Sequence, residues 1–209
     1  MDNKVLNNLS YGVYVVTTVD AQRPVGCIAN CAMQITYDTM CVSINHDNYT
    51  NSCIKKSKKF AVSILGEHVN DNIIPVFGFQ SSKDIDKFEN IKTINVDGLE
   101  VIEDSVGYII CELVNQFETE THTVFEGKMT EAKLLKDDIP MTYSYYHQVK
   151  KGKSPKAAPT YQEETPAADK VAYRCKICGY IYEGDITKEP DTYVCPICKK
   201  DKSFFEKIV

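Results

Sequence analysis

Two closely spaced cysteine pairs near the C-terminus constrain this chain more than any other feature of its sequence. Cys175 and Cys178 form the first Cys-x-x-Cys pair, and Cys195 and Cys198 form the second after an interval of 16 residues. Four thiolates in this spacing suit a tetrahedral iron or zinc ion. The segment that carries them, residues 171–209, is too short to bury a core of its own, so we expect a metal to hold it folded. Four unrelated buried cysteines would not repeat this spacing.

The composition of the whole chain is that of an ordinary globular protein. Its 209 residues are 43% hydrophobic and 25% charged, with a net charge of -5. This balance argues against a nucleic-acid binder or a binder of anionic membranes. The first residues are polar, and no apolar run reaches the roughly 20 residues of a membrane span. The cysteines number nine, which excludes complete internal pairing, so we expect a cytoplasmic protein whose thiols are reduced or bound to metal.

The composition changes between residues 150 and 170. This stretch holds three of the eight prolines and one large apolar residue, Tyr161, which is typical of an extended linker. Residues 1–149 carry 12 Lys and Arg against 20 Asp and Glu, whereas residues 171–209 carry 7 against 6. The net charges are therefore -8 and +1. We predict an acidic domain at 1–149, a linker at 150–170 and a small domain at 171–209.

The N-terminal region is dense in β-branched and aromatic residues separated by turn signals. These patterns predict strands at residues 9–19, 25–30, 39–44, 60–65, 106–120 and 123–133, and short helices at 49–59 and 67–77. Many strands with few helices favour a mainly β fold, a closed or split β-barrel.

The C-terminal segment resembles rubredoxin over its whole length. The resemblance rests on the residues around the two cysteine pairs and on an aromatic set, Tyr173, Tyr180, Tyr182, Phe204 and Phe205. It implies one mononuclear iron held by the four cysteines, in preference to the zinc of a zinc ribbon. Two positions depart from the family pattern, because Tyr193 replaces a tryptophan and Lys199 replaces a glycine. If Lys199 keeps the left-handed backbone of that glycine, the strain costs about 1 kcal/mol.

Residues 1–150 resemble the flavin reductase-like family, which uses an FMN-binding split barrel and usually forms dimers. Six segments that occur in the family's order carry the resemblance: residues 11–18, 26–36, 42–50, 60–65, 77–88 and 121–125. The resemblance implies an FMN cofactor and a homodimer. No Gly-x-Gly-x-x-Gly motif follows a predicted strand, which argues against a doubly wound dehydrogenase.

The resemblance also implies which residues meet the flavin. Small residues permit the close approach of a flat ring, and a helix N-terminus attracts a phosphate. The residues expected to line the isoalloxazine ring are Asn30, Cys31, Ala32, Met33 and Thr36. Those expected to hold the ribityl phosphate are Asn48, Tyr49, Thr50, Ser81, Ser82 and Lys87. Plainer roles stay open, since Asn30 and Thr36 also suit hydrogen bonds at strand ends, and residues 81–84 also suit a solvated loop.

His122 matches the position that in the flavin reductase-like family lies beside the flavin and contacts nicotinamide. We expect it to orient NADH or NADPH. An acid or base is not required there, because hydride passes directly from nicotinamide to flavin. The other three histidines have plainer interpretations as residues of loops or of the core edge.

Together the two resemblances imply an electron path. The whole chain resembles high-molecular-weight rubredoxins, in which NAD(P)H reduces FMN, FMN reduces the rubredoxin iron, and the iron feeds a flavodiiron protein that reduces oxygen or nitric oxide. One alternative is a flavin or ferric reductase with an accessory iron module. A second alternative is not an enzyme: a zinc-ribbon docking module attached to an inactive barrel.

Overall fold

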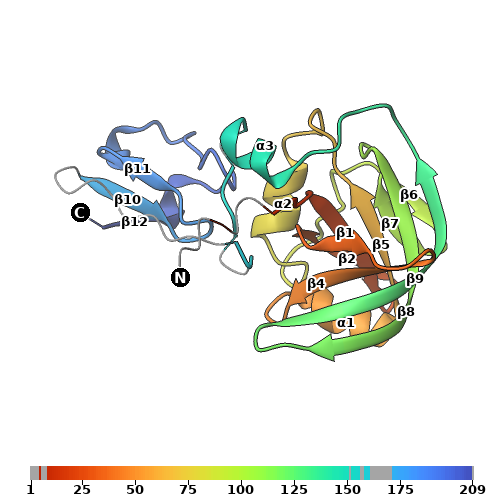
Figure 1. Ribbon diagram of the computed structural model, residues 1–209. Helices are drawn as coiled ribbons and strands as arrows, with labels where there is room; N and C mark the ends of the chain where they lie inside the picture. The colour runs from red at the N-terminus through yellow and green to blue at the C-terminus, as the bar shows by residue number, and fades with distance from the viewer. Residues whose placement is uncertain (1–4, 6–8, 151, 156–157, 161–170, 209) are drawn as a thin grey trace. The chain divides into compact units, whose positions relative to one another are not determined.

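The computed structural model describes residues 5, 9–150, 152–155, 158–160 and 171–208 (Figure 1). The chain divides into two compact units, residues 1–150 and 151–209. More than half of the predicted linker, including Tyr161, lies outside the described residues. Within the described ranges, no helix has both the length and the apolar composition needed to cross a membrane.

The first unit is built on one antiparallel sheet of seven strands. Its order is β2-β1-β5-β8-β9-β4-β3, so β2 and β3 are the two edges. The strands are β1 (Tyr14–Asp20), β2 (Arg23–Ala29), β3 (Ala32–Gln34), β4 (Thr39–Asn45), β5 (Lys59–Ile64), β8 (Gly107–Glu118) and β9 (His122–Leu134). Figure 1 shows this sheet curling into an incompletely closed barrel. The predicted mainly β split barrel is therefore confirmed.

Local sequence explains the smaller elements of this unit. The helix α1 (Tyr49–Ser57) begins where the Asn48 side chain accepts the Thr50 N–H, and it ends at left-handed Lys58. The strands β6 (Thr93–Val96) and β7 (Leu99–Ile102) join through Asp97 and Gly98, which both have positive φ. An Asp-Gly pair in this conformation is the preferred two-residue hairpin turn. The remaining helices are α2 (Ile73–Phe79) and α3 (Tyr143–Gln148).

The core of the first unit fills the curl of the sheet. Phe60 on β5, Phe125 on β9 and Ile54 on α1 are completely buried and belong to one cluster. A second cluster around Phe77 packs α2 against Val13 and its neighbours. The apolar side chains of strands and helices thus meet in the interior; β4 alternates between buried and half-buried residues, whereas β1 and β5 are buried as continuous runs.

Two predicted elements are shorter than expected. The strand predicted from residue 9 begins at Tyr14, and the helix predicted from residue 67 begins at Ile73. The delay in the helix has a local cause, because the Asn70 side chain accepts the Asn72 N–H at 2.9 Å and closes a turn there. β3, the β6–β7 hairpin and α3 have no counterpart among the predicted elements.

The second unit is a three-stranded antiparallel sheet with short 3-10 helices. Its strands are β10 (Ala172–Cys175), β11 (Ile181–Glu183) and β12 (Phe205–Lys207), in the order β11-β10-β12. The 3-10 helices are η2 (Ile186–Lys188) and η3 (Lys202–Phe204). Because Cys175 ends β10 and pairs with Phe205, the first cysteine pair begins at the end of this sheet.

Candidate functional site

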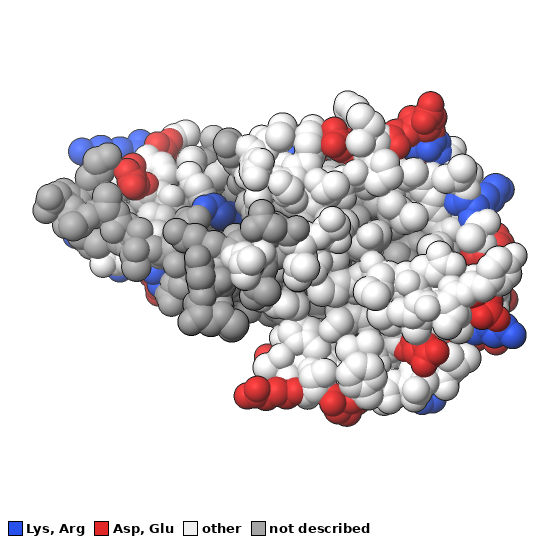
Figure 2. All heavy atoms as spheres, viewed as in Figure 1, with Lys and Arg blue, Asp and Glu red and all other residues white. Residues whose placement is uncertain are grey.

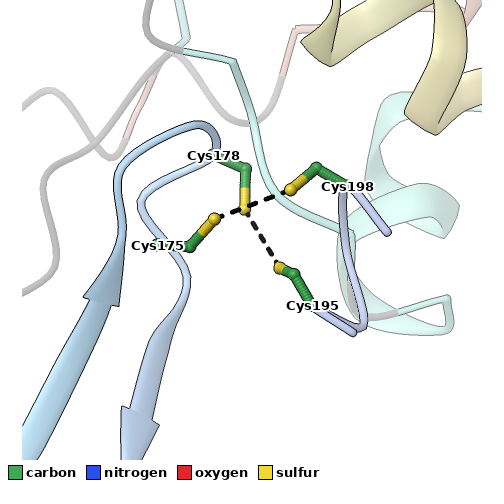
Figure 3. Close-up of side chains that lie close together, drawn as sticks. All are labelled: Cys175, Cys178, Cys195 and Cys198. Carbon is green, nitrogen blue, oxygen red and sulfur yellow. Dashed lines mark hydrogen bonds between the residues drawn. The ribbon is translucent and has the colours of Figure 1, made fainter. Parts of the chain in front are cut away.

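The four predicted ligands meet in the second unit. The Sγ atoms of Cys175 and Cys198 are 3.6 Å apart, those of Cys178 and Cys195 are 3.5 Å apart, and all four lie within 4.8 Å of one another. Figure 3 shows their side chains converging on one point. A metal bound tetrahedrally at about 2.3 Å from each sulfur requires sulfurs about 3.8 Å apart. The cluster fits a mononuclear metal with small adjustments of the sulfur positions.

The two cysteine loops share one backbone geometry. The N–H of Gly179 donates to the Cys175 carbonyl, and the N–H of Lys199 donates to the Cys195 carbonyl, both at 2.9 Å. Gly179 has φ 76° and Lys199 has φ 60°. Lys199 therefore keeps the left-handed backbone of the glycine it replaces, which costs about 1 kcal/mol.

The thiols influence one another strongly because they are buried together. Hydrogen bonds from Cys178, Cys195 and Cys198 lower the pKa of Cys175, the largest contribution coming from Cys178. The pKa of Cys178 is raised correspondingly, first by its bond to Cys175. The pKa of Cys195 is also lowered, whereas that of Cys198 is raised by its bond to Cys175, and a bound metal ion would deprotonate the thiols that remain protonated.

Aromatic rings frame the cysteine cluster. Phe205 makes edge-to-face contacts with Tyr180 and Tyr193, whose ring centroids lie 6.4 and 6.1 Å away. Tyr193 also contacts Tyr182 at 5.6 Å. Tyr193 thus packs where the rubredoxin pattern has tryptophan, which explains how the module does without one. Burial raises the pKa of Tyr193 to about 12, so its hydroxyl stays protonated.

In the first unit, the residues expected at the ring of a flavin lie along the β2–β3 connection and the edge strand β3. Asn30 is buried, Cys31 and Ala32 are half-buried, and Met33 is exposed. Thr36 is exposed and closes the turn into β4, since its hydroxyl accepts the Thr39 N–H at 3.1 Å. The plainer strand-end role of Thr36 is therefore present in the structure. Burial raises the pKa of Cys31, which does not mark it as a reactive thiolate.

The segment 48–50 lies beside β2. The Tyr49 hydroxyl donates to Asp20 at 2.5 Å. The hydroxyl of Thr50 is buried without a hydrogen bond among the described residues, and its neighbour is the Cys27 thiol, whose pKa burial raises. A buried hydroxyl without a bonded partner, at a helix N-terminus, fits a site for an anionic group.

The segment 81–87 packs on the same strand, but its side chains point to the backbone. The Ser82 hydroxyl accepts the Gly26 N–H at 3.1 Å, and the Lys87 ammonium donates to the carbonyls of Gly26 and Phe77 at 2.8 and 3.1 Å. Both side chains are buried, and burial lowers the pKa of Lys87 to about 8. Ser82 and Lys87 thus hold β2 rather than offering an exposed phosphate clamp. The Ser81 hydroxyl accepts the Lys83 N–H in a local turn.

Arg23 is a residue that sequence reasoning missed. Its guanidinium donates to the Ser82 carbonyl at 2.6 Å and lies 5.9 Å from the centre of the Tyr49 ring. It therefore connects the two segments that were expected to hold a phosphate. Its position at the start of a strand does not indicate this role in the sequence, because the segments that contain Tyr49 and Ser82 come together only in the folded chain.

His122 lies at the start of β9, at the same end of the sheet as Cys31. His122 pairs with Asn45 on the neighbouring strand β4. On the other edge of β4, the Cys31 carbonyl accepts the Ser43 N–H. Two strand spacings, about 10 Å, therefore separate the two segments. The Nδ1 atom of His122 is 2.7 Å from the Thr121 hydroxyl, which fixes the ring.

Charged and polar groups hold the hairpin that presents His122. Glu118 receives hydrogen bonds from His46 and Lys55, both at 2.9 Å, and from Thr123 at 2.7 Å. These bonds lower the pKa of Glu118, the bond from Lys55 contributing most. The end of the β8–β9 hairpin is thereby tied to α1 and β4.

Comparisons with known proteins agree with both parts of the molecule. Residues 6–152 match the flavin reductase like domain, and residues 173–206 match the rubrerythrin, rubredoxin-like domain. The chain is 37% identical to a high molecular weight rubredoxin from Moorella thermoacetica over the whole of both chains. It is 35% identical to a ferric-chelate reductase (NAD(P)H) from Archaeoglobus fulgidus, covering 78% of this chain and 99% of the relative. A solved flavin reductase in its native state superposes with a TM-score of 0.58 at 29% identity, covering 67% of this chain and 92% of the other.

Proposed function

The chain belongs to the flavin reductase-like family and carries a rubredoxin-like domain, and from this premise we propose that it passes electrons from NAD(P)H through FMN to iron and on to a protein acceptor. The observation that carries the proposal is a buried four-cysteine cluster on the same chain as a flavin reductase-like barrel. The cofactors are FMN and one iron ion bound by four cysteines. In the proposed division, residues 1–149 form the flavin domain, 150–170 the linker and 171–209 the iron domain.

The pairing of these two cofactors has a chemical reason. A nicotinamide gives up two electrons together as hydride, whereas a four-cysteine iron centre accepts one electron at a time. Bound FMN supplies both kinds of chemistry and so connects a two-electron donor to a one-electron acceptor. A linker keeps the iron domain at high local concentration near the flavin domain.

Different residues of the first unit are proposed to bind the ring and the phosphate of the flavin. We assign the ring to the β2–β3 connection, from Asn30 to Met33, where small and apolar side chains leave room for a flat group. We assign the phosphate to Thr50, in the first turn of α1, and to Arg23, at the start of β2, with Ser81 nearby. Ser82 and Lys87 act indirectly, because they fix the backbone of Gly26 between those groups.

His122 is proposed to orient the nicotinamide, and a substitution tests this role. His122→Ala removes the ring at the β9 end, so the rate of flavin reduction by nucleotide should fall about tenfold or more, while FMN affinity changes less. The measurements are stopped-flow absorbance and an FMN titration. His68→Ala is the matched control, since His68 is an exposed histidine bonded to Asp138 instead. Unchanged flavin reduction in His122→Ala would remove this residue from the site.

The surface of the first unit supports a homodimer. The edge strand β3 exposes Met33, and the following turn exposes Ile35 and Tyr37 at 43% and 96%. Figure 2 shows an uncharged surface over β1, β2 and β4, with charged side chains around its rim. An exposed edge strand with apolar side chains is normally covered, and a second copy of the same edge would cover it.

The proposed electron order is tested by anaerobic stopped-flow absorbance with NADH and, separately, NADPH. The flavin and ferric-thiolate bands should bleach in sequence, the flavin first. Cys195→Ala should abolish the iron band and electron delivery to the acceptor, yet leave flavin reduction intact. Cys53→Ala is the matched control, because Cys53 is a buried cysteine outside the cluster. Equal loss of flavin reduction and electron delivery in Cys195→Ala would contradict this order.

The terminal acceptor is proposed to be a flavodiiron oxygen or nitric oxide reductase, as the resemblance implies. A second candidate function has its own support, because a relative that matches 78% of this chain is named a ferric-chelate reductase. Turnover with ferric chelates that is as fast in Cys195→Ala as in the unaltered protein would favour this candidate. Turnover that requires the cysteine cluster and a protein acceptor would exclude it.

A further inference from the structure

The iron end of the second unit, formed by the two cysteine loops, is rich in lysine. Cys178 and Cys198 are the two ligands with measurable exposure, at 2% and 1%, whereas Cys175 and Cys195 have none. Electrons passing to a partner therefore leave most directly beside Cys178 and Cys198. We propose that this end is an electropositive docking surface for an electron-transfer protein that carries Asp and Glu around its own redox centre. The inference rests on the proposed function, since it takes the iron as the point where electrons leave.

Three lysines and no acidic residue lie within the two cysteine loops, residues 175–180 and 195–200. Lys176 and Lys199 are exposed, and Lys200 is half-buried. Phe204 brings the loops together, because its carbonyl accepts the Lys176 N–H at 2.8 Å and its ring lies 5.4 Å from the Lys200 ammonium. Phe204 thus contacts one lysine of each loop, Lys176 through its backbone and Lys200 through its ammonium group.

Acidic residues of this unit are placed elsewhere or are already engaged. Glu183 pairs with Ala172, at the opposite end of β10 from Cys175 and thus about 10 Å along the strand. Asp185, which follows that end, caps η2. Asp201 lies nearest to the lysines in sequence, but its carboxylate accepts the Ser203 N–H at 2.9 Å and caps η3. Of the remaining acidic residues, Glu189 accepts the Tyr182 hydroxyl, Asp191 pairs with Lys202 at 2.6 Å, and Glu206 lies opposite Arg174 in the sheet. The two cysteine loops therefore carry lysines and no carboxylate of their own.

An exposed apolar contact completes the surface. Val194, immediately before Cys195, is 42% exposed, and Pro196 is exposed inside the second loop. Apolar side chains surrounded by charged ones are the usual composition of a small, transient electron-transfer interface.

The charge of the two cysteine loops and the net charge of the whole chain predict partners of opposite charge. The chain has a net charge of -5, which would favour a cationic partner. The three lysines at the iron end would favour an anionic one. At physiological salt, charges more than about 8–10 Å away are largely screened, so the nearest groups dominate docking.

The test uses two redox-inert paramagnetic ions of opposite charge, hexacyanochromate(III) and hexaamminechromium(III). Each is titrated into the zinc-loaded full chain while amide NMR signals are followed. The anion should broaden signals from residues 176–180 and 195–200 at lower concentration than any other described region, and the cation should not. Broadening of these signals by the cation, or by neither ion, would overturn the inference. Zinc loading keeps this result independent of electron flow.

Matched variants then assign the effect to the lysines. The double variant Lys199→Glu and Lys200→Glu should weaken broadening by the anion about tenfold at low salt. Lys188→Glu is the control, because Lys188 is an exposed lysine at the hairpin end and only 3.8 Å from Asp185. It should leave the broadening within about twofold. The double variant changes the net charge by twice as much as Lys188→Glu, so a loss of about threefold in Lys188→Glu would mean that total charge decides binding, and would overturn the inference.

Electron transfer gives a second readout with the iron-loaded protein. The reduced iron centre gives one electron to ferricyanide, which becomes ferrocyanide, and this rate should fall about tenfold in the double lysine variant. The Lys188→Glu rate should stay within about twofold. An unchanged rate in the double variant would contradict the docking surface alone. A protein without a ferric-thiolate band would instead contradict the proposed function, while the NMR test would still stand.

Discussion

The first unit is organised around large apolar side chains, whereas the second is organised around sulfur. Phe60, Phe77 and Phe125 are each at most 1% exposed in the first unit. In the described part of the second unit, seven residues form the buried apolar set, and four of these are the cysteines. We therefore expect the barrel to fold without its cofactor, whereas the small unit depends on a metal ion to replace the core it lacks.

Metal removal should separate the two units most sharply. With a chelator, or in Cys195→Ala, the second unit should lose its ordered amide signals, because binding free energy of a structural metal is about as large as the folding free energy of so small a domain. The first unit should keep its thermal midpoint. Amide NMR and calorimetry measure the two effects. A second unit that stays ordered without metal would contradict its dependence on a metal ion.

Truncation of the aromatic core should have the reverse effect. Phe60→Ala leaves a cavity between β5, Gly127 and Cys111 and should destabilise the first unit by about 3–5 kcal/mol. The ferric-thiolate band should be unchanged. Phe117→Ala is the control, since Phe117 is 59% exposed and should cost well under 1 kcal/mol. Urea denaturation measures both, and loss of the iron band in Phe60→Ala would show that the units do not fold independently.

Acid should act on the first unit through Asp138. The pKa of Asp138 is lowered to about 2, first by the hydrogen bond from His68 and also by backbone N–H groups and Lys136. A lowered carboxylate pKa stabilises the fold above its unfolded value near 3.9, and this contribution is lost as pH falls toward 2. Asp138→Asn should lower the urea midpoint at pH 7 and flatten its change between pH 4 and 2. Asp137→Asn, at the exposed neighbour, should do neither.

The smallest expected effect is one that both units share. Lys58 and Lys199 both adopt left-handed backbone, with φ 61° and 60°. Glycine removes that strain, so Lys58→Gly should raise the stability of the first unit by up to about 1 kcal/mol. Lys199→Gly should slow metal release from the second by a corresponding factor. Lys56→Gly, inside α1, should instead destabilise by about 1 kcal/mol, and a gain there would refute the backbone explanation.

Local signals in the sequence were sufficient for some features and not for others. The strands rich in apolar and β-branched residues, such as β4 and β5, lie within one or two residues of their predicted bounds. The start of α2 was mispredicted because the Asn70 turn competes with helix formation. The short strand β3 has no alternation of its own and exists because β4 lies beside it.

The residues expected to hold the phosphate also show where local sequence signals are insufficient. Ser82 and Lys87 have side chains that suit an anion, and the sequence alone supports that interpretation. The structure turns both toward Gly26, since a buried backbone carbonyl and N–H also require partners. Arg23 has no neighbouring motif, and its approach to Tyr49 and Ser82 follows from strand and helix packing.

By itself, the sequence determined the four-cysteine ligand set, the mainly β class and the resemblance to two families. Ligand spacing and strand alternation are short-range properties, so a linear pattern contains them. Only the tertiary structure decided which polar side chains serve the backbone, how the segments at β2 meet, and that Lys176 and Lys200, from two separate loops, both contact Phe204. These depend on contacts between residues far apart in sequence, and the packing of the folded chain sets them.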